Sequence, residues 1–344
     1  MQKELTNPGP LLNKAGELCE AGYARTLIKS YDRHAIRAAG YRIKEWDYYL
    51  IANDRWGVAL TIDDNSYMGM LSFSLLNFSK PWEHTASIIY PFTRGKTNLP
   101  ATSASGDITV QRKDADFCFR VLPDGSRRLD CRMNNFMDGK PIHAEFTLTE
   151  APQDSMVIVT PFAEDKKAFY YNQKINCMRA AGRVEWDGST IEFDPAETFG
   201  TLDWGRGVWT YKNTWYWGSG NAMVNGKPFG FNIGYGFGDT SAASENMLFY
   251  DGKAHKLDRL TFGIPQKDGK DDFMAPWCFT SSDGRFEMEF TPVLDRASKT
   301  DIGIICSDQH QVFGRFNGTA TLDDGTILEI RDLLGFAEKV YNKW

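Results

Sequence analysis

Apolar and polar residues alternate with a period of two along much of this chain. Segments such as HAEFTLTE, GRVEWDG, STIEFDP and FEMEFTPV change character at every residue, which is typical of a strand with one buried face. Asp-Gly and Asn-Gly dipeptides favour tight hairpin turns, because the central residues of those turns need positive φ. These dipeptides begin at Asp124, Asp138, Asp187, Asn225, Asp251, Asp268, Asp283, Asn317 and Asp324. The pattern predicts an all-β, antiparallel fold.

Helical periodicity is confined to residues 27–40 and 333–341, where we expect short peripheral helices. The segment KEWDYYLIANDRWGVALTI resembles NTWYWGSGNAMVNGKPFGFNIGY, since each has an aromatic alternating strand, a short turn and a second strand. This echo favours two β-barrel or sandwich lobes packed together. We place an N-terminal lobe at 1–168 and a C-terminal lobe, carrying LDWGRGVW, at 169–344.

Composition limits the partners that the chain is expected to bind. Its 344 residues include 39 Lys and Arg against 45 Asp and Glu, without a basic block, which argues against nucleic acid as a partner. No apolar run is long enough for a membrane-spanning helix, and the first residues lack the features of a signal peptide. We expect a cytoplasmic protein with a small-molecule ligand and no stable membrane anchor.

Cysteine and histidine spacing gives no metal signature. The six cysteines form no CxxC pair, and no histidine lies within five residues of another, so we expect neither a metal nor another cofactor. A two-residue loop at Asp124 and Gly125 would place Cys118 opposite Cys131. That arrangement permits a cross-strand disulfide, or two buried thiols in a reducing compartment.

The stretch GTLDWGRGVWTYKNTWYWGSG concentrates four tryptophans between Gly200 and Gly220. If residues 209–219 form one strand, side chains that alternate along it share a face. That face would hold Trp209, Tyr211, Asn213, Trp215, Trp217 and Ser219. It could be the core face of a strand or the wall of a ligand pocket.

The next segment, PFGFNIGYGFG, alternates large side chains with glycine. Phe229, Phe231, Ile233, Tyr235 and Phe237 share one face, whereas Asn232 stands among glycines on the other. A glycine face needs a close neighbour. This neighbour could be an aromatic side chain from the adjacent strand, or a ligand for which Asn232 is the polar anchor.

Four charged or titratable groups are candidates for chemistry. Asp203 would suit a general acid if burial raised its pKa, or would be a structural ion pair if it met Arg206. Glu245 stands at the head of an apolar strand, and a carboxylate there could pair with Asp203 across a glycosidic bond. His310 should share a strand face with Asp308, as an acid or base unit or as a polar rim.

The segments FGTLDWGRGVWTYKNTWYWGSG, KEWDYY and DQHQVFGRFNGTATLDDGTILEIRDLLGFAEKVYNKW resemble the bacterial family catalogued as domain of unknown function 2804. The resemblance runs from the NPGPLLNKAGEL opening to Trp344. More remotely, the layout is similar to two-lobed, lipocalin-like (calycin) proteins such as the carotenoid hydratases of the hydroxyneurosporene synthase type and plant tocopherol cyclases.

The remote resemblance implies an enzyme in which a protonated carboxyl starts the reaction and aromatic faces stabilise a carbocation. Asp203 would be the acid, Arg206 its electrostatic partner, and Trp204, Trp209, Trp215 and Trp217 the cavity wall. The expected activity is that of a cofactor-independent hydratase or lyase, isomerase or cyclase acting on a lipophilic or terpenoid-like molecule. A non-catalytic carrier of a hydrophobic ligand and a carbohydrate-active protein are the alternatives.

Overall fold

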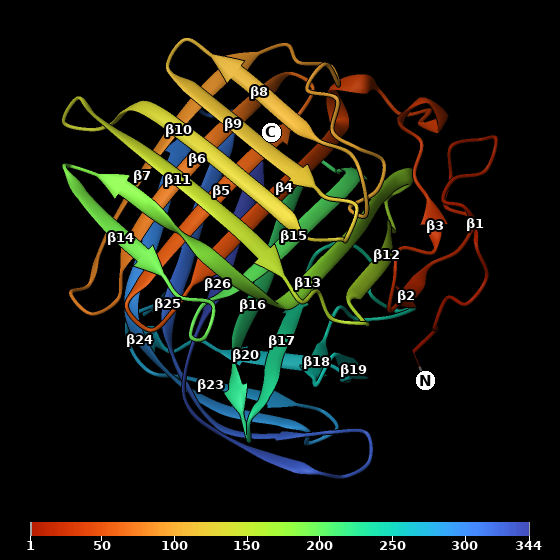
Figure 1. Cartoon of the computed structure of the whole chain (residues 1–344). Coiled ribbons are helices and arrows are strands. Elements are labelled where there is room, and N and C mark those ends of the chain that lie inside the picture. The colour runs from red at the N-terminus through yellow and green to blue at the C-terminus, as the bar shows by residue number, and fades with distance from the viewer. Residues whose placement is uncertain (1, 344) are drawn as a thin grey trace.

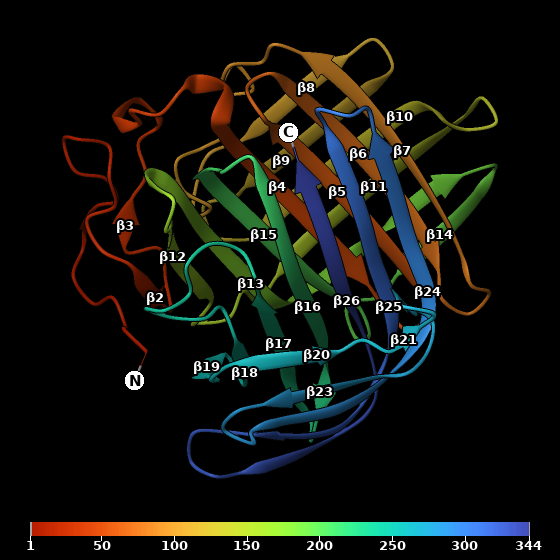
Figure 2. The ribbon, with the colours of Figure 1, turned by 180° about the vertical axis from the view of Figure 1, so that it is seen from behind.

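The chain folds into two large antiparallel sheets, and the computed structural model describes residues 2–343. Figures 1 and 2 show that both sheets are strongly curled and that they pack against each other. The long path of the first sheet runs through β7 (Trp82–Pro91), β6 (Met68–Asn77), β5 (Trp56–Asp64), β4 (Ile43–Ala52), β15 (Phe199–Val208), β13 (Asp165–Trp186), β11 (Lys140–Thr149), β10 (Arg127–Met137), β9 (Ala115–Val121) and β8 (Ile108–Arg112). Three more strands of this sheet lie off the long path. β12 (Met156–Phe162) and β14 (Ser189–Phe193) pair with β13, and β2 (Gly22–Ala24) pairs with β12.

The second sheet has nine strands, and two small ladders complete the fold. In spatial order the second sheet contains β19 (Lys253–Lys256), β18 (Met247–Tyr250), β17 (Lys227–Tyr235), β16 (Lys212–Val224), β26 (Ile327–Lys343), β25 (Cys306–Thr321), β24 (Phe286–Asp301), β23 (Trp277–Ser281) and β20 (Leu260–Gly263). The small ladders join β1 (Gly9–Pro10) to β3 (Lys29–Ser30) and β21 (Gln266–Lys267) to β22 (Lys270–Asp271). The predicted all-β, two-lobed architecture is confirmed.

Five of the Asp-Gly and Asn-Gly turns are two-residue hairpins with positive φ at both central positions, as the sequence predicts. Their first residues are Asp138, Asp187, Asn225, Asp251 and Asp268. The Asp124-Gly125 turn is longer, because the register pairs Val121 with Arg127. Cys118 therefore lies opposite Asp130 rather than Cys131, and both cysteines are free thiols.

The helical predictions are wrong. Residues 27–40 contain β3 and only a short 3-10 turn, η1 (Arg33–Ala35), and a second turn, η2 (Gly40–Arg42), ends just beyond them. Residues 333–341 belong to β26, which is covered on one side by the second core and on the other by the first sheet. A strand buried on both faces has a nearly continuous apolar run, and such a run can imitate one face of a helix.

The expected division at residues 168 and 169 falls within β13, a strand of the first sheet. The first sheet continues through β15, and the chain reaches the second sheet only at Lys212. The LDWGRGVW motif therefore lies in the middle of the first sheet. The division of the chain into domains at 168 remains a prediction.

Three apolar clusters fill the molecule: one inside the first sheet, one inside the second, and a smaller one between the sheets. The inter-sheet cluster combines residues of β4, β5 and β6 with residues of β16, β25 and β26: Tyr48, Leu50, Ala59, Leu76, Phe78, Trp217, Phe313 and Phe336. Figure 2 shows β16, β26, β25 and β24 lying over β15, β4, β5 and β6. The two sheets thus bury one face against each other, and the candidate site lies in this layer.

Candidate functional site

The side chains of the LDWGRGVW motif lie on both faces of strand β15. Because side chains alternate along a strand, Thr201, Asp203 and Gly205 face the layer between the sheets. Trp204 and Arg206 face the opposite way, into the core of the first sheet, where Trp204 packs edge-on against Tyr171. Asp203 and Arg206 therefore point apart.

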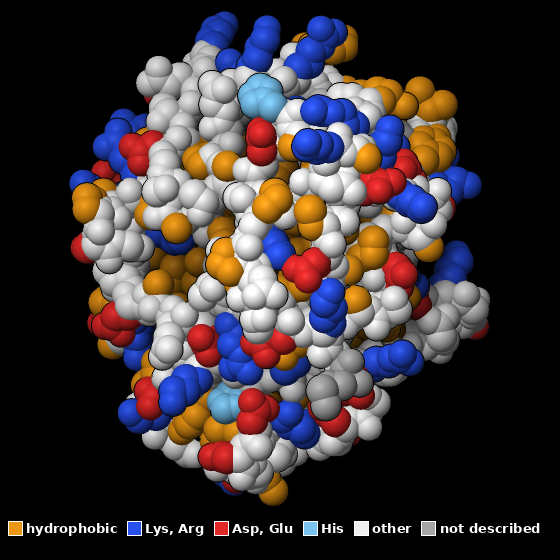
Figure 3. Space-filling view, turned by 90° about the vertical axis from the view of Figure 1, so that its right-hand side faces the viewer, with side chains coloured by type: hydrophobic (Ala, Val, Ile, Leu, Met, Phe, Trp, Pro, Cys, Tyr) orange, Lys and Arg blue, Asp and Glu red, His pale blue; other side chains and the backbone are white. Residues whose placement is uncertain are grey.

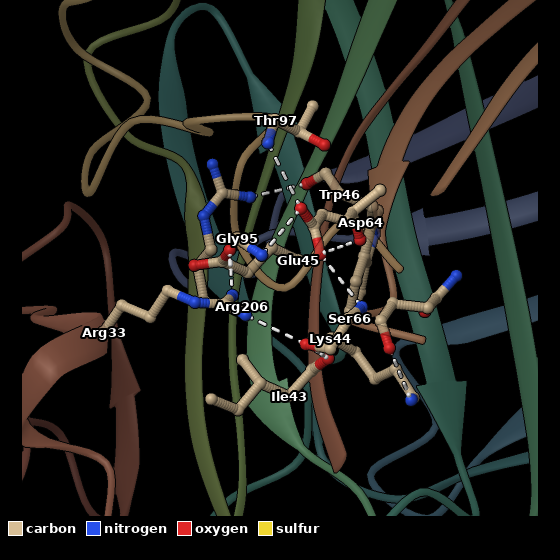
Figure 4. Close-up of polar contacts among 12 residues, drawn as sticks. Arg33, Ile43, Lys44, Glu45, Trp46, Asp64, Ser66, Gly95, Thr97 and Arg206 are labelled. Atoms are coloured by element: carbon tan, nitrogen blue, oxygen red, sulfur yellow. Dashed lines mark hydrogen bonds and ion pairs between the residues drawn. The ribbon is translucent and has the colours of Figure 1, made fainter. Parts of the chain in front are cut away.

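Arg206 is fully buried and occupied by other partners. Its guanidinium lies 3.0 Å from the Asp47 carboxylate and donates to the carbonyl oxygens of Trp46, Gly205 and Pro100. Figure 4 shows its contact with the Trp46 backbone. Burial raises the pKa of Asp47 to about 6, although the nearby guanidinium opposes this shift. The expected pairing of Asp203 with Arg206 is wrong, and Arg206 instead holds β15 to β4 and to the Pro100 segment.

The true partners of Asp203 come from β13. Lys174, its cross-strand neighbour, places its ammonium 2.8 Å from Asp203 Oδ1, and Asn172 Nδ2 donates to the same oxygen at 2.6 Å. The Lys174 ammonium also lies 3.8 Å from the centre of the Trp217 ring, in the second sheet. This ion pair is almost completely removed from solvent and links the two sheets.

A row of side chains in the second sheet faces this ion pair. Arg296, Gln311, Glu338 and Trp217 are successive cross-strand neighbours on β24, β25, β26 and β16. Glu338 accepts hydrogen bonds from Gln311 Nε2 and Trp215 Nε1, both at 2.9 Å. Burial raises the pKa of Glu338 to about 7, although these hydrogen bonds and the charges of Arg296 and Lys174 lower it. A substantial fraction of Glu338 is therefore a neutral acid near neutral pH.

We call these facing residues the central cluster, which consists of Tyr48, Asn172, Lys174, Asp203, Trp217, Gln311 and Glu338. Asn172 Oδ1 is a buried polar atom without a hydrogen-bond partner among residues 2–343. Tyr48 Oη and Gln311 Oε1 make no hydrogen bond of good geometry there either, although the Gln311 amide is close enough to Tyr48 to act against the burial that raises the pKa of its hydroxyl. Buried polar atoms are normally satisfied, and each exception needs an explanation such as water or a ligand. The central cluster thus combines an ion pair, a carboxyl with a raised pKa and free hydrogen-bonding capacity.

A cleft of ≈ 320 Å³ opens between the sheets beside the central cluster. Thr201 on β15 and Ser219 on β16 line it, together with Leu50 and Phe313. Each of these residues lies two positions along its strand from a member of the central cluster, on the same face. Two strand residues span ~7 Å, so the cleft lies about that far from the central cluster, and none of the cluster residues lines it.

Interlocked aromatic rings occupy the opposite end of the layer. Trp46, Tyr170, Trp209, Trp215 and Phe237 meet in ring contacts of 4.9–6.1 Å between centroids. The Trp46 indole lies where a Cβ of Gly205 would be, 2.0 Å from that position, so the glycine makes room for the ring. These indoles pack against one another. The structure therefore supports the core interpretation of the aromatic stretch, and the cleft beside Ser219 is lined by other residues.

The structure brings three further predicted residues to the edge of the central cluster. Asn232 accepts from Trp217 Nε1 at 2.7 Å, and its Nδ2 donates to the Glu245 backbone carbonyl at 2.9 Å. The Glu245 carboxyl lies over Gly234, and burial raises its pKa. Ser219 accepts a hydrogen bond from Asn176. A side chain thus occupies the glycine face of β17.

The other predicted residues lie elsewhere. Tyr235 stacks on Tyr216 on the far face of the second sheet, and exposed Tyr211 donates to the Ile304 carbonyl. The His310 imidazole stacks on Phe273 and pairs with Asp295 at 2.7 Å, which raises its pKa. Its second nitrogen lies 3.7 Å from Asp308, the neighbour expected from the sequence.

One group of potential metal ligands occurs among the described residues, on β10 and β11. Ligand atoms of Asp130, His143 and Glu145 lie within 4.8 Å of one another. Asp130 is exposed, and Arg183 already pairs with Glu145 at 2.7 Å. This group is remote from the inter-sheet layer, since β10 is separated from β15 by β11 and β13.

Five residues of the central cluster were not predicted from the sequence: Tyr48, Asn172, Lys174, Gln311 and Glu338. A lysine inside the strand segment FYYNQKINCM is itself a signal, because lysine is rarely buried without a partner. Glu338 was hidden by the helical interpretation of 333–341. Tyr48 and Gln311 carry no local signal, since their positions depend on how the sheets pack.

Comparison with known proteins agrees with this architecture. The family model described as "Domain of unknown function (DUF2804)" matches residues 2–344. The chain belongs to this family. No curated protein matches the sequence. Within residues 2–343, no helix is long and apolar enough to cross a membrane.

Solved structures share the fold at low sequence identity. Kievitone hydratase from Nectria haematococca aligns over 98% of this chain and 99% of its own, with a TM-score of 0.56 and 13% identity. A protein from Nitrosomonas europaea, provisionally assigned as AttH, aligns over 90% of this chain and 97% of its own, with a TM-score of 0.55 and 13% identity. Such identities establish a common lipocalin-like, two-lobed fold and leave the activity to be argued from the site.

Proposed function

We propose that this protein catalyses the acid-assisted addition of water to, or its elimination from, a lipophilic small molecule bound between the two sheets. The observation that carries the proposal is the central cluster. It places a carboxyl with a pKa of about 7 opposite a buried carboxylate–ammonium pair, beside a cleft and an unpartnered polar atom. Perturbed titratable groups gathered beside a cleft are typical of catalytic sites.

Glu338 has the properties of a proton donor. Its burial keeps much of the carboxyl protonated near neutral pH, as acid catalysis requires. In the hydration direction the Glu338 proton forms a C–H bond at a carbon–carbon double bond. The resulting cation would be balanced by the Glu338 and Asp203 carboxylates, because the Trp217 ring already contacts the Lys174 ammonium.

Asp203 suits the opposite task. Its carboxylate can accept a proton from the attacking water, while Lys174 and Asn172 hold it in place. Water oxygen then bonds to the cationic carbon, and the proton that leaves the water returns through Asp203 to Glu338, so that atoms and charge balance. Elimination runs the same steps in reverse. The fold is shared with a kievitone hydratase, a protein named for a hydration reaction, and this supports the choice of reaction.

The test combines ligand identification with solvent isotope labelling. Lipophilic molecules extracted from the purified protein, together with terpenoid alkenes and tertiary alcohols, would be incubated with it in D₂O. Hydration should place one deuterium on carbon. Glu338→Gln and Asp203→Asn should each lower kcat at least ~100-fold, the usual worth of a positioned acid or base. Glu329→Gln, an exposed site on the same strand, should not.

Two outcomes would reject the proposal. If the wild-type protein retains a ligand but incorporates no deuterium into any extracted compound, it is a carrier. If Glu338→Gln turns over as fast as Glu329→Gln, Glu338 is not the proton donor.

A further inference from the structure

Large hydrophobic side chains gather, exposed, at one end of the molecule. Ile302 and Ile304, at the tip of the β24–β25 hairpin, are 67% and 72% exposed, and Phe92 is 65% exposed. Tyr41, Ile89, Tyr211 and Tyr341 are also among the exposed large hydrophobic residues. In Figure 2 the tip of this hairpin lies at the top, beside the C-terminus, and in Figure 3 hydrophobic side chains gather with Lys and Arg at the upper right.

Hydrogen bonds join the segments that carry several of these residues. The Tyr211 hydroxyl donates to the Ile304 carbonyl at 2.9 Å, and the Arg42 guanidinium, next to Tyr41, donates to the Trp209 carbonyl at 3.0 Å. Phe92 belongs to the segment that is anchored to the start of β4 through Ser66 and Asp64, as Figure 4 shows for Gly95 and Thr97. We call this surface the apolar end; it consists of Tyr41, Ile89, Phe92, Tyr211, Ile302, Ile304 and Tyr341.

Basic side chains are interleaved with the apolar end although the chain as a whole carries a net charge of −6. Lys212 and Lys343 are cross-strand neighbours on β16 and β26. Arg94 lies over the Phe92 ring, with Lys96 two residues further on. None of these four side chains forms an ion pair with a described residue. Asp301, next to Ile302, is an exposed acidic exception. Exposed apolar side chains with unpaired basic ones among them complement the acyl chains and phosphates of an anionic lipid surface.

We propose that the apolar end docks reversibly on an anionic lipid bilayer. The partly buried Trp46, Trp209 and Trp215 lie between this surface and the central cluster, so docking would place the aromatic end of the inter-sheet layer against the lipid. Docking does not rest on the proposed function, because the cleft opens at the other end of the inter-sheet layer. The two can therefore fail separately.

The experiment is co-sedimentation of the full chain with vesicles, measured without substrate. Wild type should bind vesicles of phosphatidylcholine with a minority of phosphatidylglycerol, and bind more weakly as salt is raised or when phosphatidylglycerol is omitted. Ile302→Ser with Ile304→Ser should weaken binding by about tenfold or more, because acyl contact is lost. Lys212→Gln with Lys343→Gln should weaken it severalfold and reduce the salt dependence.

Ile327→Ser is the matched control. Ile327 is 67% exposed, like Ile302, but starts β26 at the end of the strand opposite Lys343. It should leave vesicle binding unchanged, with all variants checked for native circular dichroism. No binding by wild type, or equal losses for Ile327→Ser and the Ile302/Ile304 variant, would overturn the proposal. So would a dimer that Ile302→Ser with Ile304→Ser converts to a monomer, because the surface would then be an interface between copies.

Discussion

Replacing Lys174 by methionine would leave the Asp203 carboxylate buried without its ammonium partner. The side chains are similar in length, so the change removes a charge and little volume. The Lys174 and Asp203 side chains are only 3% and 10% exposed. Deleting one partner of a buried ion pair typically costs about 3–5 kcal/mol, since the remaining charge loses its compensation. Asn172 still donates to Asp203, so we expect the lower half of that range.

An exposed ion pair of similar length provides the control. Lys227, at the start of β17, and Asp251, in the β18–β19 turn, are joined at 3.0 Å, with side chains 51% and 56% exposed. Lys227→Met should cost at most about 1 kcal/mol, because water solvates the remaining carboxylate. The two substitutions are chemically identical, so the difference between them measures burial.

The assay is urea unfolding at neutral pH, with the free energy of unfolding obtained from the midpoint and slope. The double variant Lys174→Met/Asp203→Asn should be more stable than Lys174→Met alone, because the asparagine amide leaves no uncompensated charge in the interior. The reasoning is refuted if Lys174→Met and Lys227→Met destabilise the protein equally.

Three further predictions concern Glu338, Gly205 and Cys131. The pKa of Glu338 is raised from its ordinary value of 4.5 to about 7 in the folded protein. Protonation of Glu338 therefore contributes stability that is fully present below pH 4.5 and is lost as the pH rises through about 7. This loss is at most about 3 kcal/mol, and it should vanish from the pH profile of unfolding in Glu338→Gln. Gly205→Ala should cost about 1–3 kcal/mol in the same urea assay, because its Cβ would collide with Trp46, whereas Gly40→Ala, with open space around it, should cost much less. Cys131 is buried with a raised pKa, so mass spectrometry should find it unalkylated until the protein unfolds.

Local turn chemistry explains why the fold class was predictable. Asp138-Gly139 and Asn225-Gly226 each adopt positive φ at both central positions, as these dipeptides favour. The turn at Asp124 shows the limit, because its loop, residues 122–126, has an odd number of residues and so moves Cys118 out of register with Cys131. Turn type is a local property, whereas register also depends on which residues the sheet buries.

The site was less predictable because it assembles from both sheets. The alternation around Asp203 is visible in the sequence, but the identity of its partner depends on whether Lys174 or Arg206 shares its face. Arg206 is three positions away and therefore on the opposite face of the strand. The apolar run around Glu338 resembles a helix because β26 is covered on both sides.

The proposed function depends most on Glu338 being a buried acid that faces the Asp203–Lys174 pair and is about half protonated near neutral pH. Infrared difference spectroscopy of the full chain, wild type against Glu338→Gln, can follow the carbonyl stretch of the protonated carboxyl as pH is varied. The account predicts a band that disappears with a midpoint at about pH 7. A midpoint near the ordinary glutamate value of 4.5 would contradict it.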